Sequence, residues 1–268
     1  MKYNILMLPL LILLYIRPVG AQFYQPPQPL AEQSEIRSWL EKELIYPEEA
    51  LSSKTQGKVE VHFAVDENGQ ASDFRISEGL SEDLDKEAIR LVRKLQWKPA
   101  MNAGQAVEAH HSYSIRFNIR QYNRMVRNRG YTLRENPYEP VDTSQKIYNF
   151  GTLDKAPQPL FSDESIGLAR YIQQELNYPS TALTLSISGT VSLAYVIEEH
   201  GLVSNIHIVQ SVGGGCDNEA IRLLQDIEWM PGIKNDTAVR SYGKLDIIFR
   251  LPDGSRQQAV PNQQQRSM

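Results

Sequence analysis

The chain has 268 residues, of which 41% are hydrophobic and 22% are charged, and its formal net charge is −4 at pH 7. This length suits two domains better than one, at roughly 100 to 150 residues each, and the composition is ordinary for a soluble globular protein. Because there is no basic excess to neutralise phosphates, the composition argues against a nucleic-acid-binding protein.

The first 21 residues have the features of a secretory signal peptide. Lys2 precedes an apolar run from Ile5 to Ile16, and Val19-Gly20-Ala21 offers small residues for cleavage. The run is shorter than the roughly 20 residues needed to cross a bilayer. We therefore expect cleavage after about Ala21, which leaves 26 basic and 32 acidic residues and a net charge of −6. The alternative is an uncleaved anchor, with Arg17 at the membrane boundary.

One segment of fifteen residues occurs twice, 132 residues apart. DKEAIRLVRKLQWKP begins at Asp85, DNEAIRLLQDIEWMP begins at Asp217, and eight positions are identical. Unrelated segments would share roughly one position. The same offset relates Tyr46-Pro47 to Tyr178-Pro179, and PPQPL before the first copy is echoed by APQPL before the second. These matches indicate an internal duplication.

The duplication and the composition together divide the chain. The predicted parts are a signal peptide (1–21), a proline-rich lead-in (22–33), a first unit (34–119), a linker (120–163), a second unit (164–251) and a disordered polar tail (252–268). The linker begins with an arginine-rich run, which is more typical of a solvated charged segment than of a site for an anionic partner.

Within each unit the periodicity predicts the order α-β-β-α-β. In the first unit the elements expected are a helix over 36–44, a strand over 59–65, a strand around 74–76, a helix from 85 and a strand over 112–119. A helical crossover brings the third strand back parallel to the second, so the first strand lies between them. The predicted fold is α+β: two small antiparallel or mixed sheets of strand order 2-1-3, each with helices on one face and its third strand at an edge.

The sequence gives little support for catalysis or metal binding. Cys216 lies on the apolar face of the repeated helix and is expected to be a core residue. His62 and His110 could share one sheet face near Glu60, but the second copy does not preserve them and their spacing is not that of a metal site. No motif of a hydrolase, nucleotide-binding protein or metalloprotease occurs. We therefore predict a non-enzymatic protein without a cofactor.

The ordered pattern YP..A......G.V.V.F.V...G, an A-[IL]-[RK] helix, W..P and S.RF.I resembles the TonB C-terminal domain family. The resemblance implies a periplasmic, non-catalytic module that captures an extended peptide segment of an outer-membrane transporter or another envelope protein by strand addition. The residues that would then contact the partner lie on the two third strands: Ser112, Tyr113, Ser114, Arg116, Lys244, Asp246, Ile248 and Arg250.

Two alternatives stay open within this resemblance. Energy-transducing members of the family are anchored in the inner membrane and carry a long proline-rich spacer, so an uncleaved N-terminal segment would make the protein a transducer. Strand pairing could also join two copies of the chain, as in a self-associating envelope scaffold.

The outward face of the second sheet is expected to be more apolar than that of the first. The residues Val196, Val203, Val209 and Ile248 take the places of Ala64, Ala71, Ser77 and Arg116. Because exposed apolar patches usually mark contacts, we predict that this face is covered by the linker, the first unit or a partner.

Overall fold

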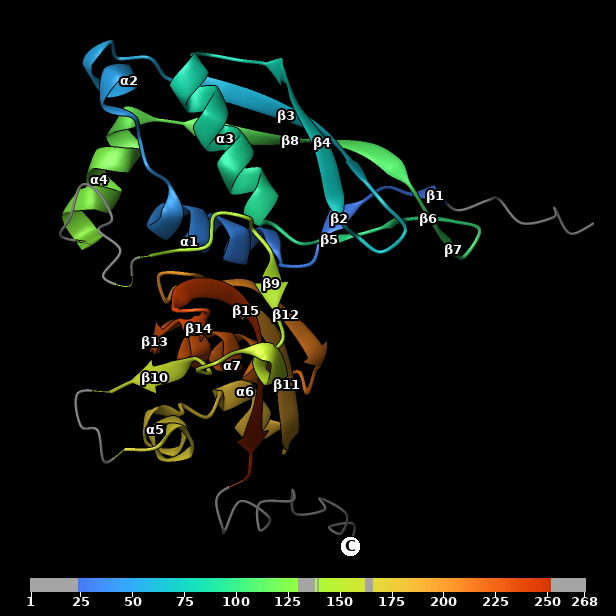
Figure 1. The fold of residues 1–268 in the computed structure, drawn as a ribbon. Helices are drawn as coiled ribbons and strands as arrows, with labels where there is room; N and C mark the ends of the chain where they lie inside the picture. Colours follow the sequence, from blue (N-terminus) through green and yellow to red (C-terminus); the bar gives the residue numbers. More distant parts are fainter. Residues whose placement is uncertain (1–23, 130–137, 139, 162–165, 252–268) are drawn as a thin grey trace, which may run out of the picture.

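The computed structural model describes residues 24–129, 138, 140–161 and 166–251. It contains two similar units of helices and strands, one above the other in the view of Figure 1. The predicted signal peptide and polar tail lie outside the described residues. In the part of the chain that is described, no helix is long and apolar enough to cross a membrane.

The first unit is built on a three-stranded sheet of order β4-β3-β8. Its strands are β3 (Gly57–Val65), β4 (Ala71–Glu78) and β8 (Ala109–Phe117), and β3 is antiparallel to both neighbours. This is the expected order of second, first and third strands. Helix α3 (Glu82–Lys94) contacts all three strands and buries their inner side chains.

Local sequence explains why α3 forms where it does. The Ser81 hydroxyl accepts a hydrogen bond from the backbone N–H of Leu84 at the N-cap. Three acidic residues lie in the first turn and two basic residues in the last, which complements the helix dipole. Leu84, Ala88 and Leu91 are fully buried because their spacing places them on one face.

The second unit repeats this architecture. Three strands of its five-stranded sheet follow the order β12-β11-β15: β11 (Gly189–Ile197), β12 (Val203–Gln210) and β15 (Thr237–Phe249). Helix α7 (Cys216–Gln225) is the counterpart of α3 and contacts β11 and β12. Cys216 is a free, fully buried member of this core, which confirms the prediction for it.

Shorter elements complete both units. The helices are α1 (Gln33–Glu43) and α2 (Glu48–Ser52) in the first unit, and α5 (Leu168–Glu175) and α6 (Ser180–Thr184) in the second. The short strands are β5 (Trp97–Lys98), β6 (Ala100–Asn102), β7 (Gln105–Val107), β13 (Glu228–Met230) and β14 (Gly232–Lys234).

The segments that precede the two units are folded onto them in the same way. Strand β2 (Gln28–Pro29) pairs with β5, and Pro29 lies opposite Trp97. Strand β10 (Gln158–Leu160) pairs with β13, and Pro159 lies opposite Trp229. Strand β1 (Tyr24–Gln25) also pairs, with β6. The PPQPL and APQPL echo therefore marks a repeated structural element.

The segment expected to be a linker contains more structure than its composition indicates. It includes α4 (Ile119–Arg129), β9 (Ile147–Tyr148) and a 3-10 turn, η1 (Phe150–Thr152). Tyr122 and Met125 of α4 are spaced by three residues and pack into the first core. The sequence prediction missed this helix because its arginines dominate the composition, while Arg120, Arg124 and Arg127 are exposed on the solvent side.

The hairpin-turn glycines supply a direct test of the repeat. Gly69 (φ +81) and Gly201 (φ +85) have left-handed conformations, and a Cβ at either position would overlap the carbonyl oxygen of Trp97 or Trp229. Gly104 (φ +83) has a similar conformation, but a Cβ there would meet no atom within 4 Å. A substitution at Gly104 therefore measures backbone strain alone, whereas substitutions at Gly69 and Gly201 measure strain together with steric overlap.

We expect Gly69→Ala and Gly201→Ala each to lower the free energy of unfolding by about 2–4 kcal/mol, because positive φ and overlap with a carbonyl add together. Gly104→Ala should cost only about 1 kcal/mol. Urea unfolding of the three variants measures the difference. Equal losses in all three would contradict the packing described.

Candidate functional site

The outer edge of β8 is the longest regular border among the described strands of the first unit. Strand β8 pairs with β3 without a register shift from Ala109 to Phe117, and no described backbone group pairs with its other edge. Ser114 and Arg116 are exposed along it, whereas Ser112 and Tyr113 are half-buried. Such a row of unpaired N–H and C=O groups is a template for another strand.

The corresponding border of β15 is partly occupied by the chain itself. On the edge opposite β11 and β14, Ala238 bridges Val141, and Arg240-Ser241 pair in parallel with Ile147-Tyr148 of β9. From 242 to 249 the strand pairs with β11, and no other described segment takes its second edge. Lys244, Asp246 and Ile248 are exposed on this open part, and Arg250 follows the end of the strand.

The opposite borders, on β4 and β12, are irregular. Each of these strands has two register shifts against its central neighbour. Asp73 and Asn205, at equivalent positions, have φ values of 55° and 51°. Bulges of this kind bend a strand and protect an edge from pairing. The regular borders are therefore those of the third strands.

The same bulges overturn the predicted apolar face of the second sheet. Val203 lies opposite the inward residue Ile197 and packs against the core, and Val209 falls at the second register shift. Val196 and Ile248 do share the outward face, but Val196 is buried whereas Ile248 is 53% exposed and Val209 is 64% exposed. The prediction that the four residues form one covered face is wrong, because an inserted residue reverses the alternation.

The end of this face that holds Val196 meets the first unit. Helix α1 contacts β12, and the Gln96 side chain donates a hydrogen bond of 3.0 Å to the Tyr242 hydroxyl. Figure 1 shows α1 at the boundary between the units. The first unit therefore covers part of the second sheet, which was one of the expected covers.

A group of charged side chains is buried at this boundary. We call it the interunit cluster; its members are Glu43, Lys94, Glu198, Glu199, His200 and Arg240. The Lys94 ammonium, only 1% exposed, lies 2.9 Å from Glu43, 3.2 Å from Glu198 and 2.7 Å from Glu199. One lysine of the first unit is thus held by carboxylates of both units.

The second unit also caps the end of α3. The Lys94 carbonyl oxygen accepts hydrogen bonds from Arg240 Nη2 at 2.8 Å and from Asn205 Nδ2 at 2.9 Å. Asn205 Oδ1 accepts one from the Gln96 backbone N–H at 2.7 Å. Carbonyls at a helix C-terminus lack partners within the helix, and a cation is favourable there. The contact therefore satisfies groups that the first unit leaves open.

With this geometry established, the family can be assigned. The family model described as "Gram-negative bacterial TonB protein C-terminal" matches residues 42–119 and 174–251. The chain belongs to this TonB C-terminal family. Members are protein-interaction modules of the Gram-negative envelope, and here two such domains follow one another in one chain.

Two solved structures are similar to parts of the chain. Both are solution structures of the Helicobacter pylori TonB C-terminal domain, one of residues 194–285 and one of residues 179–285 of that protein. They show 18% and 17% sequence identity, cover 32% of this chain and 87% and 79% of their own, and have a TM-score of 0.24. No curated protein shows a significant sequence match.

The interunit cluster shifts the acidity of its members. Burial raises the pKa of Glu43, but the charges of His200 and Lys94 outweigh burial and hold this pKa well below its ordinary value. Burial likewise raises the pKa of Glu198, but the charges of Arg240 and Lys94 outweigh burial and lower this pKa below its ordinary value. Burial lowers the pKa of Lys94, whereas the surrounding carboxylates raise it to about 12. Glu43, Glu198 and Lys94 are thus ionised at neutral pH.

The cluster is absent from the repeat pattern, which is why the sequence analysis missed it. Lys94 corresponds to Asp226, and Arg240 corresponds to Glu108. These are reversals of charge at otherwise matched positions of the two TonB C-terminal domains. These charge reversals were the feature of the sequence that could have indicated the cluster, since they mark positions at which the two copies have different contacts.

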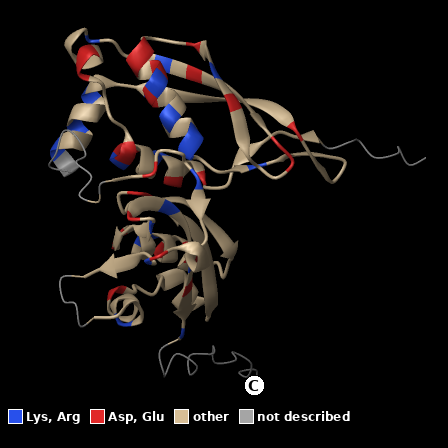
Figure 2. Ribbon diagram, viewed as in Figure 1, with Lys and Arg blue, Asp and Glu red and all other residues tan. Residues whose placement is uncertain are grey.

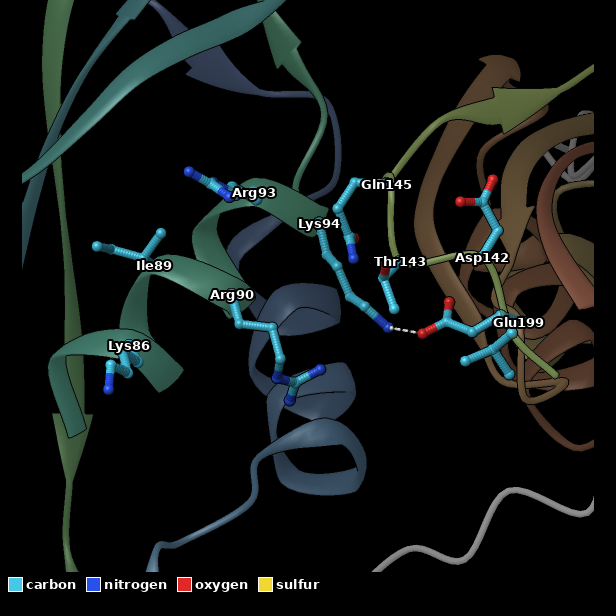
Figure 3. A pocket seen from close by; sticks show the side chains of 10 residues that line it. Lys86, Ile89, Arg90, Arg93, Lys94, Asp142, Thr143, Gln145 and Glu199 are labelled. Atoms are coloured by element: carbon cyan, nitrogen blue, oxygen red, sulfur yellow. Dashed lines mark hydrogen bonds and ion pairs between the residues drawn. The ribbon is translucent and has the colours of Figure 1, made fainter. Parts of the chain in front are cut away.

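A cavity of about 410 Å³ lies beside the cluster, between α3 and residues 141–145. Figure 3 shows Lys94 reaching to Glu199 across it. The other cations of its wall are engaged as well: Lys86 with Glu82, Arg90 with Glu43 and Glu87, and Arg93 over the ring of Phe74. Because acidic neighbours balance Lys86, Arg90 and Lys94, and the Phe74 ring engages Arg93, the cavity is poorly suited to a free anion.

The histidines of the first sheet do not assemble a metal site within the described residues. The His62 and His110 rings stack at 5.4 Å between centroids, and His62 Nδ1 is 3.1 Å from the Ser112 hydroxyl. Glu60 is bound to Lys58 instead. Among the residues described, no group of three or more histidine, cysteine or acidic side chains could hold a metal ion.

We expect Lys94→Ala to lower the free energy of unfolding by about 3–5 kcal/mol, because it leaves buried carboxylates without their cation. The matched control is Asp226→Ala in the second domain, whose 51% exposed side chain pairs with Arg222 and should cost about 0–1 kcal/mol. Urea unfolding measures both. Similar small losses for the two variants would show that the interunit cluster does not hold the domains together.

The pKa shifts also predict an acid-sensitive contact between the domains. The pKa values of Glu43 and Glu198 are lower in the folded protein than the value of about 4.3 in an unfolded chain. Their stabilisation is fully present above that pH and is lost as the pH falls toward the folded values. We expect the stability of Glu43→Gln to fall less steeply than that of the natural protein between about pH 5 and pH 3. Parallel profiles from urea titrations would exclude this role for Glu43.

Proposed function

We propose that the protein binds an extended segment of an outer-membrane transporter, or of another envelope protein, as an additional strand on β8. The observation that carries this proposal is the unshifted border from Ala109 to Phe117, whose outer edge pairs with no described segment. Family membership supports it, since TonB C-terminal domains generally bind outer-membrane transporter proteins. Main-chain hydrogen bonds would supply affinity, and alternate side chains would supply specificity.

The two domains are not equivalent in this proposal. The outer border of β15 is taken up by Val141 and β9 over residues 238–241, so a partner could pair only with the part from 242 onward. The border of β8 offers nine residues in regular register. The first domain is therefore the principal binding domain, and the second is an auxiliary one.

Side chains along β8 indicate what the bound segment carries. Arg116 is exposed at one end of the border, beside the exposed arginines of α4. Opposite charges across a strand pair are favourable by about 0.2–1 kcal/mol, whereas like charges are unfavourable. A segment with an acidic residue near Arg116 and small or polar residues near Ser112 and Ser114 would fit this border.

The alternatives differ in measurable ways. A released protein has a mature N-terminus near Gln22 and is recovered in the soluble periplasm, whereas an anchored energy transducer fractionates with the inner membrane. A self-associating scaffold would pair β8 with a second copy, so its mass in light scattering would rise with concentration. We propose the released, partner-binding form because a cleaved signal peptide fits residues 1–21.

The test is site-specific photocrosslinking in intact cells from Ser114 on β8. The controls are Asp246 on β15 and Arg75 on the irregular border of β4, all of which are exposed. We expect crosslinks to an envelope protein from position 114 at least about fivefold above those from position 75, with intermediate yield from position 246. Equal yields from positions 114 and 75 would refute strand addition on β8.

Proline substitutions test the main-chain contact separately. Outward N–H groups alternate along an edge strand, so of Tyr113→Pro and Ser114→Pro one removes an outward donor and the other disturbs pairing with β3. The variant that retains the natural melting temperature should lose crosslinking from the border. Full retention of crosslinking in that variant would mean that side chains, not the backbone, hold the partner.

A further inference from the structure

Helix α4 covers a surface of the first domain that has a counterpart in the second. Tyr122 of α4 lies 5.3 Å from Tyr46 between ring centroids, and Met125 packs into the same core. Helix α4 also contacts α1. Under this cover, Tyr46 is 1% exposed.

The second domain preserves the site on which α4 lies. The Tyr178 hydroxyl donates to the Ile187 carbonyl oxygen at 2.6 Å, as Tyr46 does to Thr55 at the same distance. Tyr178 meets Phe249 edge to face at 5.7 Å, as Tyr46 meets Phe117 at 5.7 Å. In the part of the chain described, no aromatic side chain takes the place of Tyr122 beside Tyr178.

The residues around this site are correspondingly less buried. Leu168, Leu176 and Tyr178 are half-buried. Their counterparts in the first domain, Ile36, Leu44 and Tyr46, are 2%, 8% and 1% exposed. The same apolar positions are therefore covered in one domain and accessible in the other.

The adjoining surface has lost its charges. Residues 176–197 contain no charged side chain, whereas residues 44–65 of the first domain contain five. Leu185, which replaces Ser53, is 64% exposed, and Ile187 replaces Thr55. Figure 2 shows how few charges the second domain carries relative to the first. Without charged neighbours to solvate it, exposed apolar surface such as that of Leu185 is favourable to bury against apolar groups.

We propose that this surface, lined by Leu168, Leu176, Tyr178 and Ile187 and here called the helix seat, binds an amphipathic helix of a partner protein. The internal duplication identifies the occupant: in the first domain the equivalent position holds a helix with an aromatic residue and a methionine three residues apart. Recognition of a helix through apolar side chains at i and i+3 or i+4 is a common binding mode. This site is separate from strand addition on β8 and does not depend on it.

The sequence argues against the chain's own tail as the occupant. Residues 252–268 contain two prolines, and their apolar side chains are limited to Ala259, Val260 and the terminal Met268. That pattern does not reproduce the Tyr122 and Met125 pair. A second copy could offer its α4, but the Tyr122 and Met125 side chains of that helix are already buried in its own first domain. The tail and a second copy are therefore outcomes that the experiment must separate.

The probe is a fluorescein-labelled peptide of residues 118–129, titrated into the full-length protein and followed by fluorescence anisotropy. Tethering favours the resident α4 over the free peptide in the first domain, so the peptide reports on the helix seat. We expect saturable binding that Tyr178→Ala weakens at least about tenfold, because the aromatic anchor is lost. Replacing both Tyr122 and Met125 of the peptide by alanine should weaken binding similarly. Tyr148→Ala, a half-buried tyrosine of β9, is the matched control and should change the affinity less than about twofold.

The proposal is overturned by three results. The first is the absence of saturable binding up to about 1 mM peptide, or equal binding by Tyr178→Ala protein. The second is binding that strengthens more than about tenfold on removal of residues 252–268, which would make the tail the occupant. The third is a dimer in light scattering that Tyr178→Ala dissociates, which would make a second copy the occupant. If Tyr178→Ala lowers the melting temperature, the same binding measurements are made with Leu168→Ala, and the result for that variant tests the proposal.

Discussion

The arrangement of the two domains depends on one buried ion cluster, in which Lys94 of the first domain lies among carboxylates from both domains and Arg240 of the second caps the helix that carries Lys94. Buried ion pairs contribute little net stability, since desolvation offsets their attraction. We infer that they act on specificity, because a docking that removed these charges from water without pairing them would be costly. The cluster therefore selects one orientation of the domains, and with it the relative directions of the β8 and β15 borders.

The charges at the equivalent positions would oppose the same contact between two molecules. In a head-to-tail array, the end of α7 would dock on the first domain of the next copy, and the position of Lys94 would be held by Asp226. It would face Asp66, Glu67 and Glu108, which replace Glu198, Glu199 and Arg240. Acidic groups would then meet acidic groups, at a cost that opposes association. Duplicated domains carry a risk of such polymerisation, and the charge reversals remove it.

The repeated elements were predictable because their signals are local. The α3 and α7 helices, the central strands and the burial of Cys216 follow from apolar periodicity, and the Gly69 and Gly201 turns follow from the need for positive φ. The bulges at Asp73 and Asn205 were not predictable, because a single inserted residue reverses an alternation without changing composition. Helix α4 was missed because its arginines obscured a short apolar face. The ion cluster was missed because its members lie far apart in sequence, and only the three-dimensional contact joins them.

The surfaces of the two copies differ in charge and in exposed strand length, and these differences match the segments that contact each surface. Where the domains meet, charges were exchanged so that Lys94 and Arg240 find partners. Where β9 lies along β15, the second border became shorter. Residues 176–197 contain no charged side chain, and only the end of this stretch, at Val196 and Ile197, adjoins the interunit cluster. The contact between the domains accounts for the first difference and the linker accounts for the second. Neither of them accounts for the part around Tyr178, where a preserved aromatic residue beside exposed Leu185 is suited to an apolar helix.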